Sequence, residues 1–96
     1  MIYEWDEAKR ATNLAKHGLD FVSAYTVLES DYVLIVDSPR NGQARQQAFA
    51  YVFDVLAVLS VVFIPGEDRC RVLSFRPAKR TERSIYHAWL ENHFDD

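Results

Sequence analysis

Six basic side chains gather in one short stretch of this 96-residue sequence, between positions 69 and 83. They are Arg69, Arg71, Arg76, Lys79, Arg80 and Arg83, and Glu82 is the one acid among them. The stretch therefore carries a net charge of +5, whereas the rest of the chain has five bases and thirteen acids, a net charge of −8. Because salt screens exposed charges beyond about 8–10 Å, the stretch acts as a basic patch on an acidic body. Such a patch can bind a polyanion at one place.

Arginine is well suited to bind an RNA phosphate, because its planar guanidinium donates two parallel hydrogen bonds and stays charged. Cleavage of RNA by its own 2′-hydroxyl needs a base near the 2′-oxygen, an acid near the leaving 5′-oxygen, and positive charge over the phosphate. Arg71, Arg76 and Arg83 are candidates for that charge. A solvated basic face that protects a strand edge from aggregation explains the same arginines about equally well.

Arg71 and Arg76 lie in one expected strand, in which side chains alternate between the two faces. Regular alternation would put them on opposite faces. They can meet one phosphate only if a bulge intervenes or if one of them lies where the strand ends. Pro77 makes the Arg76 end the expected irregular position.

His17 is a candidate titrating group, because histidine changes its charge near neutral pH. It follows Lys16 at the expected end of a helix, where cations offset the helix dipole, and we prefer this structural interpretation. The histidine spacing and the lack of a glycine-rich loop predict neither a metal site nor a cofactor. For the lone Cys70 we expect an inert, half-buried thiol, which fits a reducing cytoplasm.

The length predicts one domain covering residues 1–96, and a composition with 49% hydrophobic residues excludes disorder. No apolar run approaches the ~18–20 residues of a membrane span, and no secretion signal is evident, so we expect a cytoplasmic protein with no membrane partner.

Capping residues and periodicity predict the elements. A first helix over residues 6–17 is capped by Asp6 and stopped by Gly18, and Asp20 caps a second short helix ending near residue 28. Four strands are expected at residues 32–36, 45–53, 56–64 and 69–76, and Thr81 caps a last helix that reaches about residue 93. The prediction is an α+β domain with two N-terminal helices, a four-stranded antiparallel sheet and a C-terminal helix, with the helices on one face.

Two distant segments resemble the two ends of one family, the BrnT-type toxins of type II toxin–antitoxin systems. The first contains Trp5-Asp6, Lys9, Asn13, Lys16-His17-Gly18 and Phe21; the second contains Arg71-Val72-Leu73-Ser74-Phe75-Arg76, Glu82-Arg83 and Tyr86. Both segments match in order, so the resemblance covers nearly the whole chain.

The resemblance implies a RelE-like fold and a metal-independent endoribonuclease, which a BrnA-type antitoxin neutralises in a hetero-oligomer. It implies catalytic roles for Arg71, Arg76, Arg83, His17 and Glu82, and RNA binding by Arg45, Lys16, Lys79 and Arg80. Glu82 is either a general base or, as we prefer, an ion-pair partner that orients Arg83 or Arg76. The alternative interpretation is a catalytically inactive RelE-like module that binds only an antitoxin-like protein or RNA.

Overall fold

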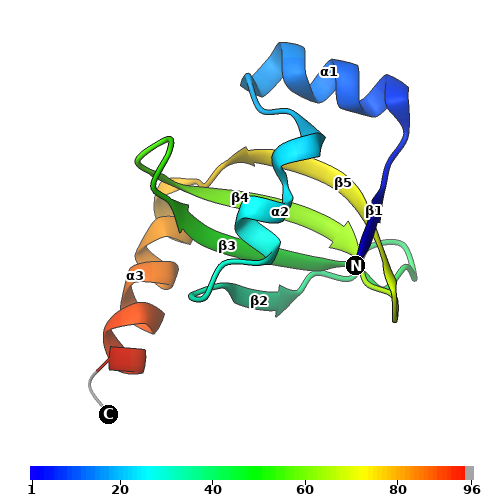
Figure 1. Ribbon diagram of the computed structural model, residues 1–96. Helices are drawn as coiled ribbons and strands as arrows, with labels where there is room; N and C mark the ends of the chain where they lie inside the picture. The colour runs from blue at the N-terminus through cyan, green and yellow to red at the C-terminus, as the bar shows by residue number, and fades with distance from the viewer. Residues whose placement is uncertain (95–96) are drawn as a thin grey trace.

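A five-stranded sheet forms the centre of the molecule in the computed structural model, which describes residues 1–94 (Figure 1). The strands are β1 (Ile2–Glu4), β2 (Leu34–Asp37), β3 (Gln46–Val52), β4 (Ala57–Ile64) and β5 (Arg69–Pro77), in the spatial order β1-β5-β4-β3-β2. The strands from β2 to β5 form the expected antiparallel meander.

The first strand corrects the prediction of a four-stranded antiparallel sheet. β1 pairs in parallel with β5, with Ile2 opposite Arg69 and Glu4 opposite Arg71, so the sheet is mixed and has five strands. A strand of three residues is too short to show a periodic pattern, and its partner lies at the other end of the chain. The sequence therefore contained no local signal for it.

Three α-helices and one 3-10 turn complete the fold: α1 (Glu7–His17), the 3-10 turn η1 (Phe21–Ser23), α2 (Tyr25–Leu28) and α3 (Arg80–Phe94). The Asp6 carboxylate accepts from the backbone N–H groups of Ala8 and Lys9, and Gly18 ends α1 with φ +69°. These two ends agree with the prediction.

The second predicted helix, over residues 20–28, is wrong as one element. Asp20 does cap this segment, but it caps the 3-10 turn η1, and a single α-helical turn follows in α2. Aromatic and β-branched residues are frequent here, and they lose side-chain freedom in a helix. The last helix also differs, because it begins at Arg80, and the predicted cap Thr81 lies inside it.

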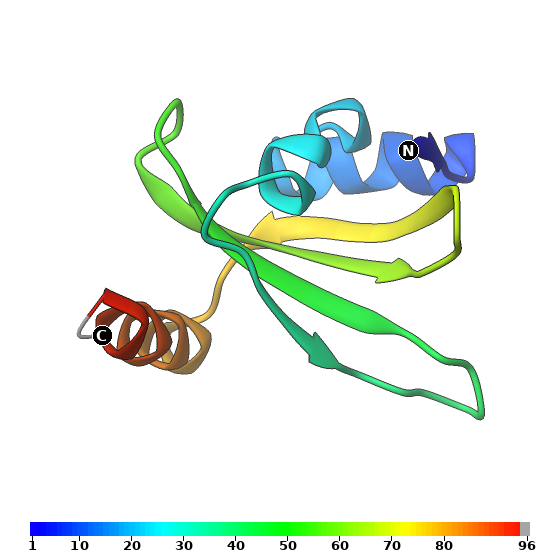
Figure 2. The same ribbon diagram turned by 60° about the horizontal axis from the view of Figure 1, so that its bottom comes forward.

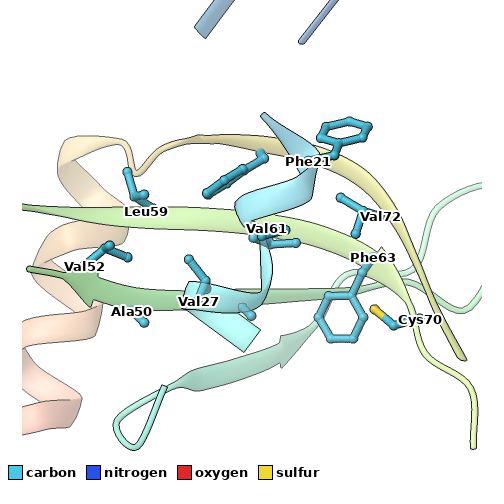
Figure 3. Packing of buried hydrophobic residues seen from close by; sticks show 12 residues of the cluster. Phe21, Val27, Ala50, Val52, Leu59, Val61, Phe63, Cys70 and Val72 are labelled. Carbon is cyan, nitrogen blue, oxygen red and sulfur yellow. The ribbon is translucent and has the colours of Figure 1, made fainter. Parts of the chain in front are cut away.

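Helices cover both faces of the sheet, whereas packing on one face was expected. The main core lies between the sheet and the segment of η1 and α2, where Phe21 and Val27 meet Val61 and Val72 (Figure 3). Helix α3 lies on the opposite face, where Tyr86 packs with Phe49, Val58 and Ala78 (Figure 2). The near-continuous apolar sequences of β3 and β4 are typical of strands that are buried on both sides.

Two of the three turns of the meander contain residues with positive φ, and they differ in sequence. Asn41 and Gly42 both have positive φ, of +53° and +75°, and these are the residues that such a turn favours. Between β3 and β4, Leu56 also has φ +53°, which costs a bulky residue roughly 1–2 kcal/mol. Among the described residues, no helix combines the length and apolar character needed to cross a membrane.

Candidate active site

A bulge in β5 decides where its arginines point. Val62 of β4 pairs with Ser74 and the next residue, Phe63, pairs with Val72, so Leu73 is inserted as an extra residue. The insertion shifts the side-chain alternation by one position. Val72 and Phe75 therefore both face the main core, each with 1% of its surface exposed.

The same shift puts Arg71 and Arg76 on the face that carries α3. The bulge is one of the two irregularities that the sequence analysis required for these arginines to share a face. Their Cα atoms still lie about 13 Å apart along the strand, because their partners Ser60 and Ile64 on β4 are separated by four steps of ~3.3 Å. Arg71 is exposed near β1, whereas Arg76 is half-buried near the start of α3.

A hollow of about 350 Å³ opens on the part of this face that α3 leaves uncovered, and we call it the basic hollow. It is lined by Lys9, Ser38, Arg40, Arg45, Gln47, Val62, Leu73, Ser74 and Arg76. Four of these residues are cations, and none of the nine is an acid. Such a lining concentrates positive potential in a concave site, which favours a phosphate.

A second hollow, of about 370 Å³, adjoins the basic hollow at the bulge, because Lys9, Leu73 and Ser74 line both. Its other lining residues come from the N-cap and body of α1, and they include Lys16 and His17. The fold thus brings a lysine and a histidine from α1 to the stretch of β5 that also carries Arg76.

Glu82 holds Arg76 in a fixed geometry. The Arg76 guanidinium donates to both carboxylate oxygens, at 2.8 and 3.0 Å, and the Lys79 backbone N–H donates to Glu82 at 2.7 Å. The Gln47 side-chain amide donates a further bond, at 3.1 Å, and joins this group to β3. The side chains of Arg76 and Glu82 are 19% and 18% exposed, so the ion pair is largely shielded from water.

The ion pair determines the protonation of both groups. Hydrogen bonds from Arg76 lower the pKa of Glu82 to about 2, and the same pair raises the pKa of Arg76. A carboxylate with so low a pKa is a weak proton acceptor near neutral pH. Its geometry suits it to orient Arg76, which is the role that we preferred from the sequence.

Five predicted residues lie outside the linings of both hollows: Glu82, which pairs with Arg76, and the four cations Arg71, Lys79, Arg80 and Arg83. Arg83 is exposed on α3 and donates to the Ala78 carbonyl at 2.9 Å. The basic stretch at residues 69–83 is therefore not one site. Of the six cations in this stretch, only Arg76 lines the basic hollow. The other three cations of the lining are Lys9 of α1 and Arg40 and Arg45 of the connection between β2 and β3.

Asn13 is the residue that the sequence interpretation missed most clearly. It is 8% exposed, and its amide donates to the carbonyls of Leu19, at 2.9 Å, and of Phe75, at 2.7 Å. Its carbonyl oxygen accepts from the Phe75 N–H at 3.1 Å. Asn13 thus pairs with β5 as a neighbouring strand would, beyond the residues that β1 reaches. A polar residue that disfavours helices, buried in a helix, was the available signal.

Lys9, Arg40, Gln47 and Ser74 were also missing from the predicted site. Within residues 1–94, no group of three or more His, Cys, Asp or Glu side chains is arranged to hold a metal ion. Cys70 is 4% exposed rather than half-buried, and burial raises the pKa of its thiol to about 11.

The family comparison supplies the class of protein to which this site belongs. Residues 5–82 match the family described as ribonuclease toxin, BrnT, of type II toxin–antitoxin system. The chain belongs to the BrnT toxin family. The match confirms the resemblance inferred from the two terminal segments. No match was found among curated proteins.

Membership of the BrnT family gives the chain a class of activity and a class of partner. The family consists of ribonuclease toxins. A type II toxin is paired with an antitoxin. The matched region contains every residue that lines the basic hollow, from Lys9 to Arg76.

Proposed function

We propose that this chain is an endoribonuclease that cleaves RNA without a metal ion, and that a BrnA-type antitoxin neutralises it. We further propose that residues 1–96 form one toxin domain. The observation that carries the proposal is the basic hollow, in which four cations and no acid line a concave site next to Lys16 and His17.

In the proposed reaction the scissile phosphate lies in the basic hollow, where Arg45 and Arg76 bind its oxygens. A base removes the proton of the 2′-hydroxyl, the 2′-oxygen attacks phosphorus, and the 5′-oxygen leaves with a proton from an acid. His17 is the proposed proton-transfer group, with Lys16 beside it. The cations stabilise the negative charge that grows on the phosphate, a role that a metal ion fills in other nucleases.

The positions outside the hollow receive a different role. Arg71, Lys79, Arg80 and Arg83 are exposed, and we assign them contacts with the phosphates that flank the scissile one. Glu82 is assigned to the positioning of Arg76, because its four hydrogen bonds hold that guanidinium toward the hollow.

Cleavage of a synthetic single-stranded RNA tests the site. We expect Arg45→Ala and Arg76→Ala each to lower the cleavage rate by about 10²–10³-fold, as loss of one charge-stabilising donor does in other enzymes. Arg69→Ala is the matched control, because it removes the same charge from an exposed residue whose partner is Glu4, outside both hollows. Equal rates for Arg45→Ala and Arg69→Ala would refute the assignment of the basic hollow.

The metal requirement is tested separately. We expect wild-type cleavage to persist in EDTA at an unchanged rate. Loss of cleavage in EDTA that magnesium restores would contradict the metal-independent mechanism, while leaving the ribonuclease class intact.

One observation favours the alternative of an inactive binding module. Arg76 is already paired with Glu82 through two hydrogen bonds, so part of its charge is compensated before RNA arrives. An inactive module would still bind RNA, and the logarithm of its affinity would fall with the logarithm of the salt concentration with a slope of about −0.7 per phosphate contacted. It would also form a complex with its antitoxin, but it would leave RNA uncut at any dose. Cleavage that depends on Arg45 and His17 would exclude this alternative.

A further inference from the structure

Three apolar side chains are exposed together in the turn between β3 and β4. Phe53, Val55 and Leu56 are 79%, 48% and 74% exposed, and we call them the apolar turn. The turn projects beyond the sheet, away from α3, in Figure 2. Contiguous exposed apolar groups on a soluble protein mark an interaction surface more often than isolated ones do.

The backbone conformation of the apolar turn supports the same interpretation. Leu56 has φ +53°, a conformation that glycine or asparagine adopts far more easily, and the turn at Asn41 and Gly42 shows that this chain uses the favoured residues elsewhere. Neither the exposure nor the conformation of Leu56 helps the isolated domain. Both are explained if the side chain is buried against a partner.

Acidic side chains surround the apolar turn. One hollow beside it, of about 410 Å³, is lined by Glu29, Asp31 and Asp54, and another, of about 260 Å³, is lined by Asp20 and Asp54. Within the described lining of these two hollows there is no lysine, arginine or histidine. Arg10 offsets the charge of Asp20 at 2.7 Å, so Glu29, Asp31 and Asp54 carry the local negative field.

The acidic hollows and the basic hollow lie at opposite ends of β3. Arg45 precedes this strand and Phe53 follows it, so the two sites are about 26 Å apart at ~3.3 Å per residue. This distance exceeds the Debye length in physiological salt, about 8 Å, so each site attracts its own ligand. A ligand of the apolar turn is therefore cationic and partly apolar, the opposite of RNA.

We infer that the apolar turn anchors the antitoxin, through a segment whose apolar side chains cover Phe53 and Leu56 and whose lysines or arginines meet Glu29, Asp31 and Asp54. This inference rests on the proposed function only in that it takes the antitoxin as the partner. The acidic surroundings disfavour an anionic membrane surface at the same place. Anchoring is separate from the basic hollow, so affinity for the antitoxin and affinity for RNA depend on different residues.

The test measures the dissociation constant of this chain for a purified BrnA-type antitoxin. A turn variant, Phe53→Ser/Val55→Ser/Leu56→Gly, removes the apolar side chains and relieves the left-handed leucine, so it is expected to fold. The control is Ile35→Ser/Val36→Ser on β2, where the residues are 45% and 37% exposed. We expect the turn variant to bind about 100-fold more weakly and the control to stay within about threefold of wild type.

A charge variant tests the acidic rim. Asp31→Asn/Asp54→Asn is expected to weaken the complex by roughly threefold to tenfold and to flatten its salt dependence, since exposed charges contribute modestly. Three outcomes would overturn the inference. The turn variant could bind the antitoxin as tightly as wild type, the β2 control could lose binding while the turn variant keeps it, or the wild-type chain could form no complex.

Two further readouts separate the possible occupants and the two proposals. If the chain alone dimerises and the turn variant is monomeric, a second copy occupies the turn and the inference fails. RNA binding by the turn variant is expected to match wild type. A chain that binds the antitoxin through the turn but leaves RNA intact would refute the ribonuclease and support the anchor. If the wild-type chain cuts RNA and the antitoxin still neutralises the turn variant, the ribonuclease is supported and the anchor is refuted.

Discussion

The hydrogen bonds of Asn13 allow a quantitative prediction, because this side chain joins α1 to the edge of β5. The substitution Asn13→Ala removes three bonds, to Leu19 O, Phe75 O and Phe75 N, at 2.7–3.1 Å. The two groups of Phe75 lie in a buried environment, so each loses its partner without gaining water. Leaving a buried polar group unsatisfied costs about 1–3 kcal/mol, and the sum is about 3–4 kcal/mol when relaxation is allowed for.

Urea unfolding at neutral pH, followed by the fluorescence of Trp5 and Trp89, measures this loss. With a slope of about 1–1.5 kcal/mol per molar urea for a chain of this size, the midpoint should fall by about 2–4 M. Thr12→Ala is the control. Thr12 is the neighbour of Asn13 in the same helix, and the substitution deletes only an exposed hydrogen bond from its hydroxyl to the Ala8 carbonyl. We expect that control to shift the midpoint by less than about 0.5 M.

A midpoint for Asn13→Ala that coincides with that of Thr12→Ala would refute the reasoning. It would mean that water satisfies Phe75 in the variant, and hence that the edge of β5 is open at this point. The rate of protease cleavage near Gly18 provides a second readout. If α1 detaches from β5 in the variant, the chain around Gly18 is exposed and should be cut faster than in wild type.

Two further predictions follow from the titrating groups. Because the pKa of Glu82 is lowered to about 2 in the folded protein and is about 4.3 when unfolded, its stabilisation is present above about pH 4.3 and is lost as the pH falls toward 2. Glu82→Gln should therefore lose about 2–3 kcal/mol at pH 7 by urea unfolding, with the gap to wild type closing below pH 4; a constant gap would exclude the linkage. Cys70 is buried with its pKa raised to about 11, so an aromatic disulfide reagent should modify it at least about 100-fold more slowly in the native protein than in urea, and equal rates would contradict its burial.

Local signals in the sequence predicted the elements whose ends are decided by neighbouring residues. Asp6 and Gly18 delimit α1 because both caps act within a turn of the helix. The strands of the meander were predicted to within about two residues, since each is bounded by turn residues such as Pro65 and Gly66. The α+β class follows from these elements.

Long-range pairing was not predictable from local patterns. β1 forms only because β5 offers an edge more than sixty residues later, and the location of α3 on the second face follows from the burial of Tyr86 against Phe49 and Val58. The basic hollow has the same character, because Lys9, the pair Arg40 and Arg45, and Arg76 come from three separate parts of the chain. The arginine-rich stretch identified one member, Arg76, and the family resemblance supplied Arg45. Neither indicated Lys9 or Arg40 as part of the site.

The pairing of the first strand with the last has a consequence for the order of events during synthesis. β1 and α1 are synthesised more than fifty residues before their partners Arg69 and Phe75. The contacts between α1 and β5 bring Lys9 and His17 close to the part of β5 that carries Arg76. They are therefore absent from any nascent chain that does not yet contain β5. A chain with this connectivity forms the basic hollow only after Arg76 has been made, whichever of its elements has folded before.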